Sequence, residues 1–159
     1  MILAFQIFIS HVADTGIMLT ILLMLAFFLY EKKDPRDFFI ILFSGAMAMF
    51  ITYTLKLVLK VPRPEHMLVL EDGYRFPSGH ATMAAVVMSL GMYYAHRYVH
   101  DKHVRYFLYI SAFAWYVLVS YSRLYLGVHY PIDVIVGGVV GISSTFFVIK
   151  IFKYLHYYK

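Results

Sequence analysis

The stretch Tyr74-Arg75-Phe76-Pro77-Ser78-Gly79-His80 joins a polar loop to a long apolar segment. The segment that follows, residues 79–98, is long enough as a helix to cross the hydrocarbon core of a bilayer, about 30 Å. Ser78 is a residue type that caps helix N-termini. The stretch therefore predicts a membrane-spanning helix that carries a histidine, His80, in its first turn.

The composition of the whole chain agrees with a membrane protein. Of its 159 residues, 62% are hydrophobic and only 14% are charged, whereas a soluble domain is closer to half apolar and a quarter charged. The net charge of +5 comes from small groups of Lys and Arg between apolar runs, which argues against a nucleic-acid partner. The chain has no cysteine, which excludes disulfides and thiol catalysis. We expect one domain, residues 1–159, with no secretory signal removed.

Five apolar segments are long enough to span the membrane. We predict an all-α polytopic transmembrane bundle with spans at residues 12–30, 38–61, 79–98, 106–121 and 131–155. Residues 1–10 are too short to span alone, and they either lie along the interface or extend the first helix. The longest polar break, residues 62–77, forms a short loop region on one face.

The distribution of Lys and Arg between the two faces predicts the orientation of the bundle. With five spans, nine of these residues fall on the face that holds the C-terminus and five on the opposite face. The positive-inside rule places the nine in the cytoplasm. We therefore expect a multi-pass protein of the cell membrane, with a cytoplasmic C-terminus and the polar loop on the outer face.

Three polar motifs lie on that outer face, at helix ends. They are Lys56-x6-Arg63-Pro64, Pro77-Ser78-Gly79-His80 and Ser122-Arg123-x5-His129-x3-Asp133. In order and spacing they resemble the three-part signature of the type 2 phosphatidic acid phosphatase superfamily, and every motif position is matched between residues 56 and 133. The family is usually drawn with six spans, so the resemblance implies five to six here.

The motif residues have the chemistry that phosphoryl transfer requires. The transition state spreads negative charge over the equatorial oxygens, which fixed cations and amide donors stabilise. Lys56, Arg63 and Arg123 supply three cations, and the planar arginine fork can hold two phosphate oxygens. Ser78 and Gly79 begin a helix, where free N–H groups and the helix dipole favour an anion.

Two histidines are the candidates for making and breaking bonds. Asp133 follows His129 by four residues, so its carboxylate can orient one ring nitrogen and leave the other as a nucleophile. His80 can protonate the leaving oxygen and later activate water. The resemblance implies the same roles, and it implies that neither a metal nor a cofactor is needed.

Six of the motif residues also have a purely structural interpretation. Lys56 could snorkel from a helix end, and Arg63 and Arg123 could be interface anchors. Ser78 could be only an N-cap, and His129 and Asp133 could cap a helix together. These interpretations would all have to hold on one side of the membrane, where interfacial charges are functional by default, so we favour a phosphate site.

Two features outside the motifs receive structural interpretations. Arg75, with His66 and Glu65, is interpreted as a solvated loop residue, with headgroup contact as the alternative. Gly137 and Gly141 have the G-x-x-x-G spacing of closely packed helices. We expect this packing inside the chain, with a dimer face as the less favoured use.

Together these features and the resemblance predict removal of a terminal phosphate from a membrane lipid phosphate or diphosphate through a phospho-histidine, and the resemblance implies that the reaction is metal-independent. Candidate substrates are phosphatidic acid, phosphatidylglycerol phosphate, undecaprenyl diphosphate and the 1-phosphate of lipid A. The partners are the bilayer and this substrate, with no obligate protein partner evident. The alternatives are a vanadium haloperoxidase, whose soluble members carry a similar signature, and a non-enzymatic lipid-phosphate binder or transporter.

Overall fold

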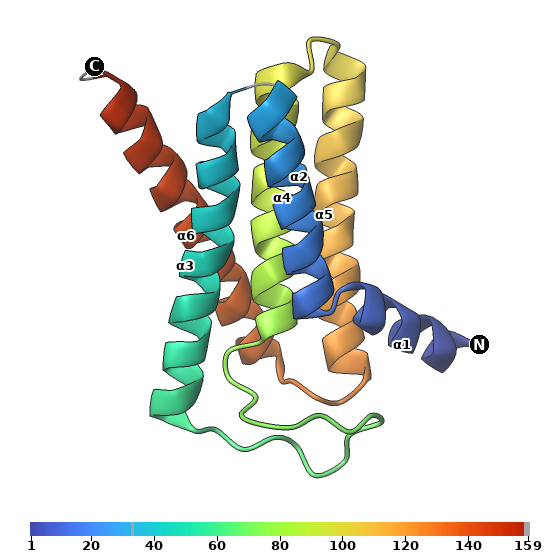
Figure 1. The fold of residues 1–159 in the computed structure, drawn as a ribbon. Helices are drawn as coiled ribbons and strands as arrows, with labels where there is room; N and C mark the ends of the chain where they lie inside the picture. The colour runs from blue at the N-terminus through green and yellow to red at the C-terminus, as the bar shows by residue number, and fades with distance from the viewer. Residues whose placement is uncertain (33, 158–159) are drawn as a thin grey trace.

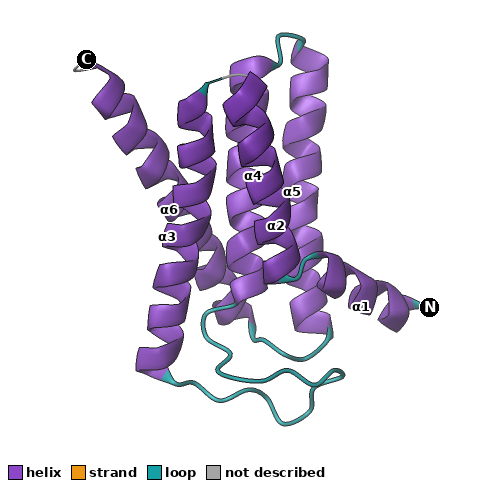
Figure 2. Cartoon of the chain, viewed as in Figure 1, coloured by secondary structure: helices purple, strands orange, loops and turns teal. Residues whose placement is uncertain are grey.

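The computed structural model describes residues 1–32 and 34–157, which form helices and connecting loops without a strand (Figures 1 and 2). The helices of this part of the chain are α1 (Ile2–Val12), α2 (Thr15–Lys32), α3 (Pro35–Leu59), α4 (Gly79–Tyr98), α5 (Lys102–Tyr125) and α6 (Pro131–Tyr157). The predicted all-α class is confirmed. The predicted spans correspond to α2 through α6, and the bounds of α4 are those predicted.

The surface of the bundle is apolar and several of its buried residues are polar. Phe50, Phe107 and Phe146 are 73%, 67% and 68% exposed, whereas Asp37 and Arg123 are fully buried. In water this distribution would be unfavourable, but in a bilayer the apolar side chains face lipid and the polar groups are satisfied inside the protein. The distribution agrees with a transmembrane protein.

Helices α3, α5 and α6 are each long and apolar enough to cross a membrane. Helix α4 lies between them and packs against α6, α5, α3 and α2. Its buried face carries small residues such as Ala81, Ala84 and Ala85, and the buried Thr82 donates its hydroxyl to the Ser78 carbonyl at 2.9 Å. Because other helices surround α4, it need not be as apolar as its neighbours.

The N-terminal region forms a helix of its own, separated from α2 by a bend of 49°. The break falls at Asp14, whose side chain caps α2 by accepting from the backbone N–H of Gly16 at 2.8 Å and of Ile17 at 3.3 Å. Helix α1 packs against α5 and points away from the bundle axis at the loop end (Figure 1). Residues 1–10 therefore do not continue the axis of the first span.

Helices α4 and α6 approach closely because two glycines of α6 face α4. A Cβ atom on Gly137 would lie 2.7 Å from the Ser78 carbonyl oxygen, and one on Gly141 would lie 2.4 Å from that of Thr82. The Ser78 N–H also donates to the Asp133 carbonyl at 3.0 Å. The G-x-x-x-G spacing thus serves packing within the chain, and it joins the start of α4 to the start of α6.

A buried carboxylate ties α3 to α4 at the opposite end of the bundle. Asp37 accepts from Arg97 Nη1 at 2.8 Å and from the Tyr98 hydroxyl. Arg97 Nη2 also donates to Asp34 at 2.9 Å. The charge of Asp37 is tolerated inside the protein because it is paired and hydrogen-bonded.

Candidate active site

The three polar motifs meet at one end of the bundle, between the helix ends and the 60–78 loop (Figure 1). Lys56 lies in the last turn of α3, His80 in the first turn of α4, Arg123 in the last turn of α5 and Asp133 in the first turn of α6. The antiparallel order of the helices accounts for this arrangement, since alternate helix ends fall on the same face.

The 60–78 loop is fixed over the site by backbone contacts. The Leu68 N–H donates to the Leu126 carbonyl at 3.0 Å, and the Arg75 N–H donates to the Val61 carbonyl at 3.1 Å. Gly127 has a φ of +69°, and a Cβ there would lie 2.9 Å from the His66 carbonyl oxygen. Only glycine fits this close turn without strain. The loop therefore has a defined path over the helix ends.

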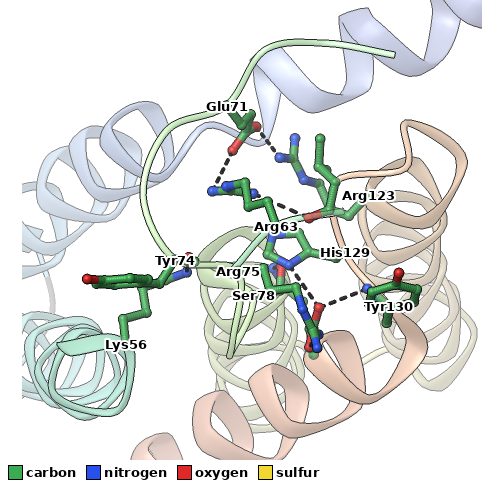
Figure 3. Close-up of polar contacts among 12 residues, drawn as sticks. Lys56, Arg63, Glu71, Tyr74, Arg75, Ser78, Arg123, His129 and Tyr130 are labelled. Carbon is green, nitrogen blue, oxygen red and sulfur yellow. Dashed lines mark hydrogen bonds and ion pairs between the residues drawn. The ribbon is translucent and has the colours of Figure 1, made fainter. Parts of the chain in front are cut away.

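His129 and Asp133 form the pair that their spacing predicts. Nδ1 of His129 lies 3.4 Å from Oδ2 of Asp133, and both side chains are almost completely buried. The contact is longer than a usual hydrogen bond. Because Nδ1 faces the carboxylate, Nε2 is the ring nitrogen that can act as the nucleophile. The same Oδ2 accepts from the Tyr130 N–H at 2.8 Å, which fixes the carboxylate (Figure 3).

Arg75 is part of this arrangement, so its interpretation as a solvated loop residue was wrong. Its Nη1 donates to Oδ1 of Asp133, and its guanidinium lies 4.7 Å from the centroid of the Tyr130 ring. The side chain is only 17% exposed. Arg75 thus holds the face of Asp133 that His129 does not use. The loop fold brings together residues 58 positions apart, which no local pattern indicates.

Lys56 and Arg63 are held mainly by carbonyl groups of the loop and of the α5–α6 turn. Lys56 Nζ donates to the Tyr74 carbonyl. Arg63 donates to the Asp72 carbonyl at 3.0 Å and 3.2 Å, and from Nη1 to the Val128 carbonyl at 3.3 Å. Carbonyl groups orient these side chains without cancelling their charge.

Arg123 is completely buried at the end of α5. Its Nη1 donates to the Ser10 hydroxyl of α1, and its Nη2 pairs with the Glu71 carboxylate. Nε of Arg123 has no hydrogen-bond partner among the described residues. Glu71 also contacts Arg63 Nη2 at 3.1 Å, so one carboxylate bridges two motif arginines (Figure 3). The sequence motifs gave no signal for either Ser10 or Glu71.

Ser78 caps α4, as its residue type predicted. Its Oγ accepts from the Ala81 N–H at 3.4 Å, and its carbonyl accepts from the Thr82 hydroxyl at 2.9 Å. The side chain is fully buried. The N-cap interpretation is therefore confirmed, while a direct contact between Ser78 and phosphate stays a prediction.

A cavity of about 400 Å³ lies at the centre of the three motifs. Five of the eight predicted site residues line it: Lys56, Arg63, Gly79, His80 and His129. The other three do not line it: Asp133 faces His129, Arg123 pairs with Glu71 on the cavity wall, and Ser78 directly precedes Gly79. The apolar side chains of Met49, Tyr53 and Leu57 from α3 complete its wall. Both histidines thus face one small space, as the proposed chemistry requires.

Burial and neighbouring charges alter the ionisation of two groups in the loops. The pKa of His129 lies below its ordinary value of 6.5, first because the ring is buried and also because Arg123 and Arg63 oppose a further positive charge. The contact with Asp133 raises the pKa of His129, but by less than burial and the neighbouring cations lower it. Burial favours the neutral form of Glu71, but Arg123 outweighs it and holds the Glu71 pKa below its usual range. The site therefore favours a neutral His129 and an ionised Glu71.

Comparison with known proteins gives the family. A model described as the PAP2 superfamily matches residues 37–157, which include all three motifs. The chain belongs to the PAP2 superfamily. This PAP2 protein is 30% identical over 145 residues to phosphatidylglycerophosphatase B of Bacillus subtilis (strain 168), which covers 89% of this chain and 70% of that protein.

Two further comparisons support the assignment. An undecaprenyl-diphosphatase of Sulfolobus acidocaldarius is 33% identical over 78 residues, 49% of this PAP2 protein and 34% of the relative. The crystal structure of a transmembrane PAP2 type phosphatidylglycerolphosphate phosphatase from Bacillus subtilis superposes with a TM-score of 0.84 at 25% identity. That match covers 96% of this PAP2 protein and 77% of the solved chain. The predicted family is confirmed.

Proposed function

We propose that this PAP2 protein removes the terminal phosphate of a membrane lipid phosphate or diphosphate through a phospho-histidine formed at His129. Its membership in a family of lipid phosphatases supports the hydrolytic activity. The observation that carries the mechanism is the position of His80 and His129 on one cavity, beside the cations Lys56 and Arg63. Asp133 lies directly behind His129.

The first step forms a bond between Nε2 of His129 and phosphorus as the bond from phosphorus to the lipid oxygen breaks. His80 donates a proton to that oxygen, and the lipid alcohol, or the lipid monophosphate from a diphosphate, leaves. Asp133 stabilises the positive charge that develops on the imidazole. In this scheme Lys56, Arg63 and Arg123 stabilise the phosphoryl oxygens, together with the N–H groups at the start of α4.

In the second step water attacks phosphorus and the bond to Nε2 breaks. His80, which lost its proton in the first step, accepts one from this water. Orthophosphate then leaves, and both histidines return to their starting states. The scheme uses only groups of this chain and water.

The α3 wall of the cavity supports a lipid substrate. Tyr53 and Leu57 line the cavity and are also 56% and 64% exposed on the apolar outside of the bundle. A lipid whose tail lies against these side chains can place its phosphate beside Lys56 without leaving the bilayer. We propose phosphatidylglycerol phosphate and undecaprenyl diphosphate as the first substrates to test, from the names of the relatives, with phosphatidic acid and the 1-phosphate of lipid A as further candidates.

We propose that the site faces the outside of the cell membrane and the C-terminus faces the cytoplasm. The support is the division of Lys and Arg between the two faces predicted from the sequence, nine against five. A reporter enzyme that is active only in the cytoplasm should therefore be active when it is fused after Lys159. A reporter that reads as external would reverse the orientation.

Phosphate release from purified protein tests the function directly. In detergent, the protein should release phosphate from at least one lipid of the four-member panel, whereas His129→Ala should release almost none. Full turnover by the His129→Ala variant would falsify the histidine mechanism. Activity should survive EDTA, and loss in EDTA that a divalent cation restores would contradict a metal-independent reaction.

A further inference from the structure

The carboxylate of Glu71 lies in the position that suits two oxygens of a phosphate. Its Oε2 lies 3.1 Å from Nη2 of Arg63, and its Oε1 contacts Nη2 of Arg123. Arginine binds carboxylates and phosphates through the same geometry, with N–H groups directed at paired oxygens. Both arginines are residues that the proposed mechanism assigns to phosphate, so Glu71 uses donors that a substrate needs.

Glu71 shields Arg123 from the catalytic cavity. Arg123 is completely buried, whereas the Glu71 side chain is 24% exposed and lines the cavity wall. An unpaired buried guanidinium is costly, so Glu71 stabilises the protein when no phosphate is bound. The phosphate must therefore replace Glu71 before Arg123 can contact it.

The surroundings of Glu71 provide room for that replacement. Glu71 lies in the 60–78 loop, two residues before Gly73, which has a φ of +73° and where a Cβ would meet no atom of the described residues within 4 Å. A second cavity of about 290 Å³ lies on the α1 side of Glu71. Its wall includes Ser10 and His11, which can donate hydrogen bonds to a displaced Glu71 carboxylate. Asp14 also lines this cavity, and its negative charge disfavours the carboxylate there.

We propose that Glu71 is an internal competitor for phosphate, which pairs with Arg63 and Arg123 in the empty site and is displaced by the phosphate of the substrate. The proposal rests on the proposed function, because it takes these arginines as the phosphate site. Glu71 lowers the affinity for every phosphate ligand, including the orthophosphate product. It therefore favours product release and sets the affinity for substrate.

Orthophosphate binding to the full chain in detergent tests this role. The Glu71→Gln substitution removes the competing charge and keeps the side-chain size, and Glu65→Gln makes the same change at an exposed position of the same loop. Titration calorimetry should show about tenfold tighter orthophosphate binding for Glu71→Gln, equivalent to 1.4 kcal/mol, and no change for Glu65→Gln. Binding that is unchanged or weaker in Glu71→Gln would overturn the proposal.

Steady-state kinetics separates competition from positioning. If Glu71 competes with phosphate, Glu71→Gln should have a lower KM for the lipid phosphate, and orthophosphate should inhibit this variant more strongly. If Glu71 instead held the arginines in place, the variant would have a higher KM and weaker inhibition, which would contradict the proposal. Should Glu71→Gln fail to fold, Glu71→Asp provides the same test, because the shorter side chain keeps the charge but cannot bridge both arginines equally well.

The two proposals can fail separately. Absence of phosphate release from every lipid would remove the proposed function, while orthophosphate titration of the same preparations would still decide whether Glu71 competes. Conversely, a wild-type protein that hydrolyses a lipid phosphate and has the same orthophosphate affinity as Glu71→Gln would keep the function and remove the role of Glu71.

Discussion

Arg75 and Asp133 form an ion pair across the carboxylate from His129, with Arg75 on Oδ1 and His129 facing Oδ2. Asp133 is fully buried and also accepts from the Tyr130 N–H. A carboxylate held on both oxygens has little freedom to rotate, so it keeps the imidazole in one orientation. Arg75 is therefore a positioning residue that acts through Asp133.

Substitution of Arg75 should lower turnover more than substrate affinity. We expect kcat of Arg75→Met to fall about 10–100-fold, since a small misplacement of a reacting group has that effect, with KM changed much less. Arg75→Lys should recover part of the loss because it can still donate to Asp133. Lipid-phosphate hydrolysis over a substrate range measures both constants. A rise in KM at constant kcat would indicate that Arg75 binds substrate instead.

The two histidines should behave differently when each is removed. His129→Ala should lose turnover by about a thousandfold or more, as expected for loss of a nucleophile. His80→Ala should retain some phosphoryl transfer and accumulate labelled protein, because no base activates water. Incubation with ³²P-labelled lipid phosphate followed by denaturing gel electrophoresis measures the label. Acid-labile label that persists in His129→Ala would place the covalent bond elsewhere.

Two glycine substitutions should separate binding from stability. Among the described residues, a Cβ on Gly79 would meet only Thr15 Oγ1, at an ordinary 3.7 Å, but it would lie on the cavity wall. Gly79→Ala should therefore fold normally and bind orthophosphate more weakly. Gly141→Ala should lower the free energy of unfolding by about 1–3 kcal/mol, since its Cβ would overlap the Thr82 carbonyl and lie 2.8 Å from Ala85 Cβ.

Thermal unfolding in detergent and orthophosphate titration measure the two effects. The interpretation of Gly79 fails if Gly79→Ala binds phosphate as tightly as the wild type. The interpretation of Gly141 fails if Gly141→Ala unfolds at the wild-type temperature.

The ionisation of His129 should be shifted toward acid. Burial, Arg123 and Arg63 all disfavour the imidazolium, so the His129 pKa lies below 6.5. A lowered pKa means that the neutral nucleophile persists at a pH where an exposed histidine is already protonated. Nuclear magnetic resonance of ¹⁵N-histidine-labelled protein, with His129→Asn for assignment, should show this midpoint below 6.5. A midpoint above 6.5 would mean that Asp133 dominates the environment of the ring.

The fold was largely predictable because membrane spans depend on local composition. The bounds of α4 follow from Ser78 at one end and the polar residues after Tyr98 at the other. The break before α2 was one of two alternatives left open, although Asp14 has the residue type of a helix cap and Gly16 follows it. A search for caps inside apolar runs would have found that break. The extent of the domain, residues 1–159, stays a prediction.

The candidate site was predictable where it depends on spaced motifs, as for His80 and His129, which share a cavity. It was not predictable where loop residues supply the contacts. Arg75, Glu71 and Ser10 meet motif residues across 52 to 113 positions of the chain. Those contacts depend on the path of the 60–78 loop and on the bend before α2, which local sequence patterns do not specify.

The glycine contact between α4 and α6 fixes the helix starts of the active site without using the side chains that face the lipid. The helix starts that carry His80 and Asp133 are joined backbone to backbone, by the hydrogen bond from Ser78 to the Asp133 carbonyl and by the close contact at Gly137. Residues such as Phe107 and Phe146 can therefore change with the thickness or acyl composition of the host bilayer while the imidazoles keep their places. The same active site can therefore operate in membranes that differ widely in lipid composition.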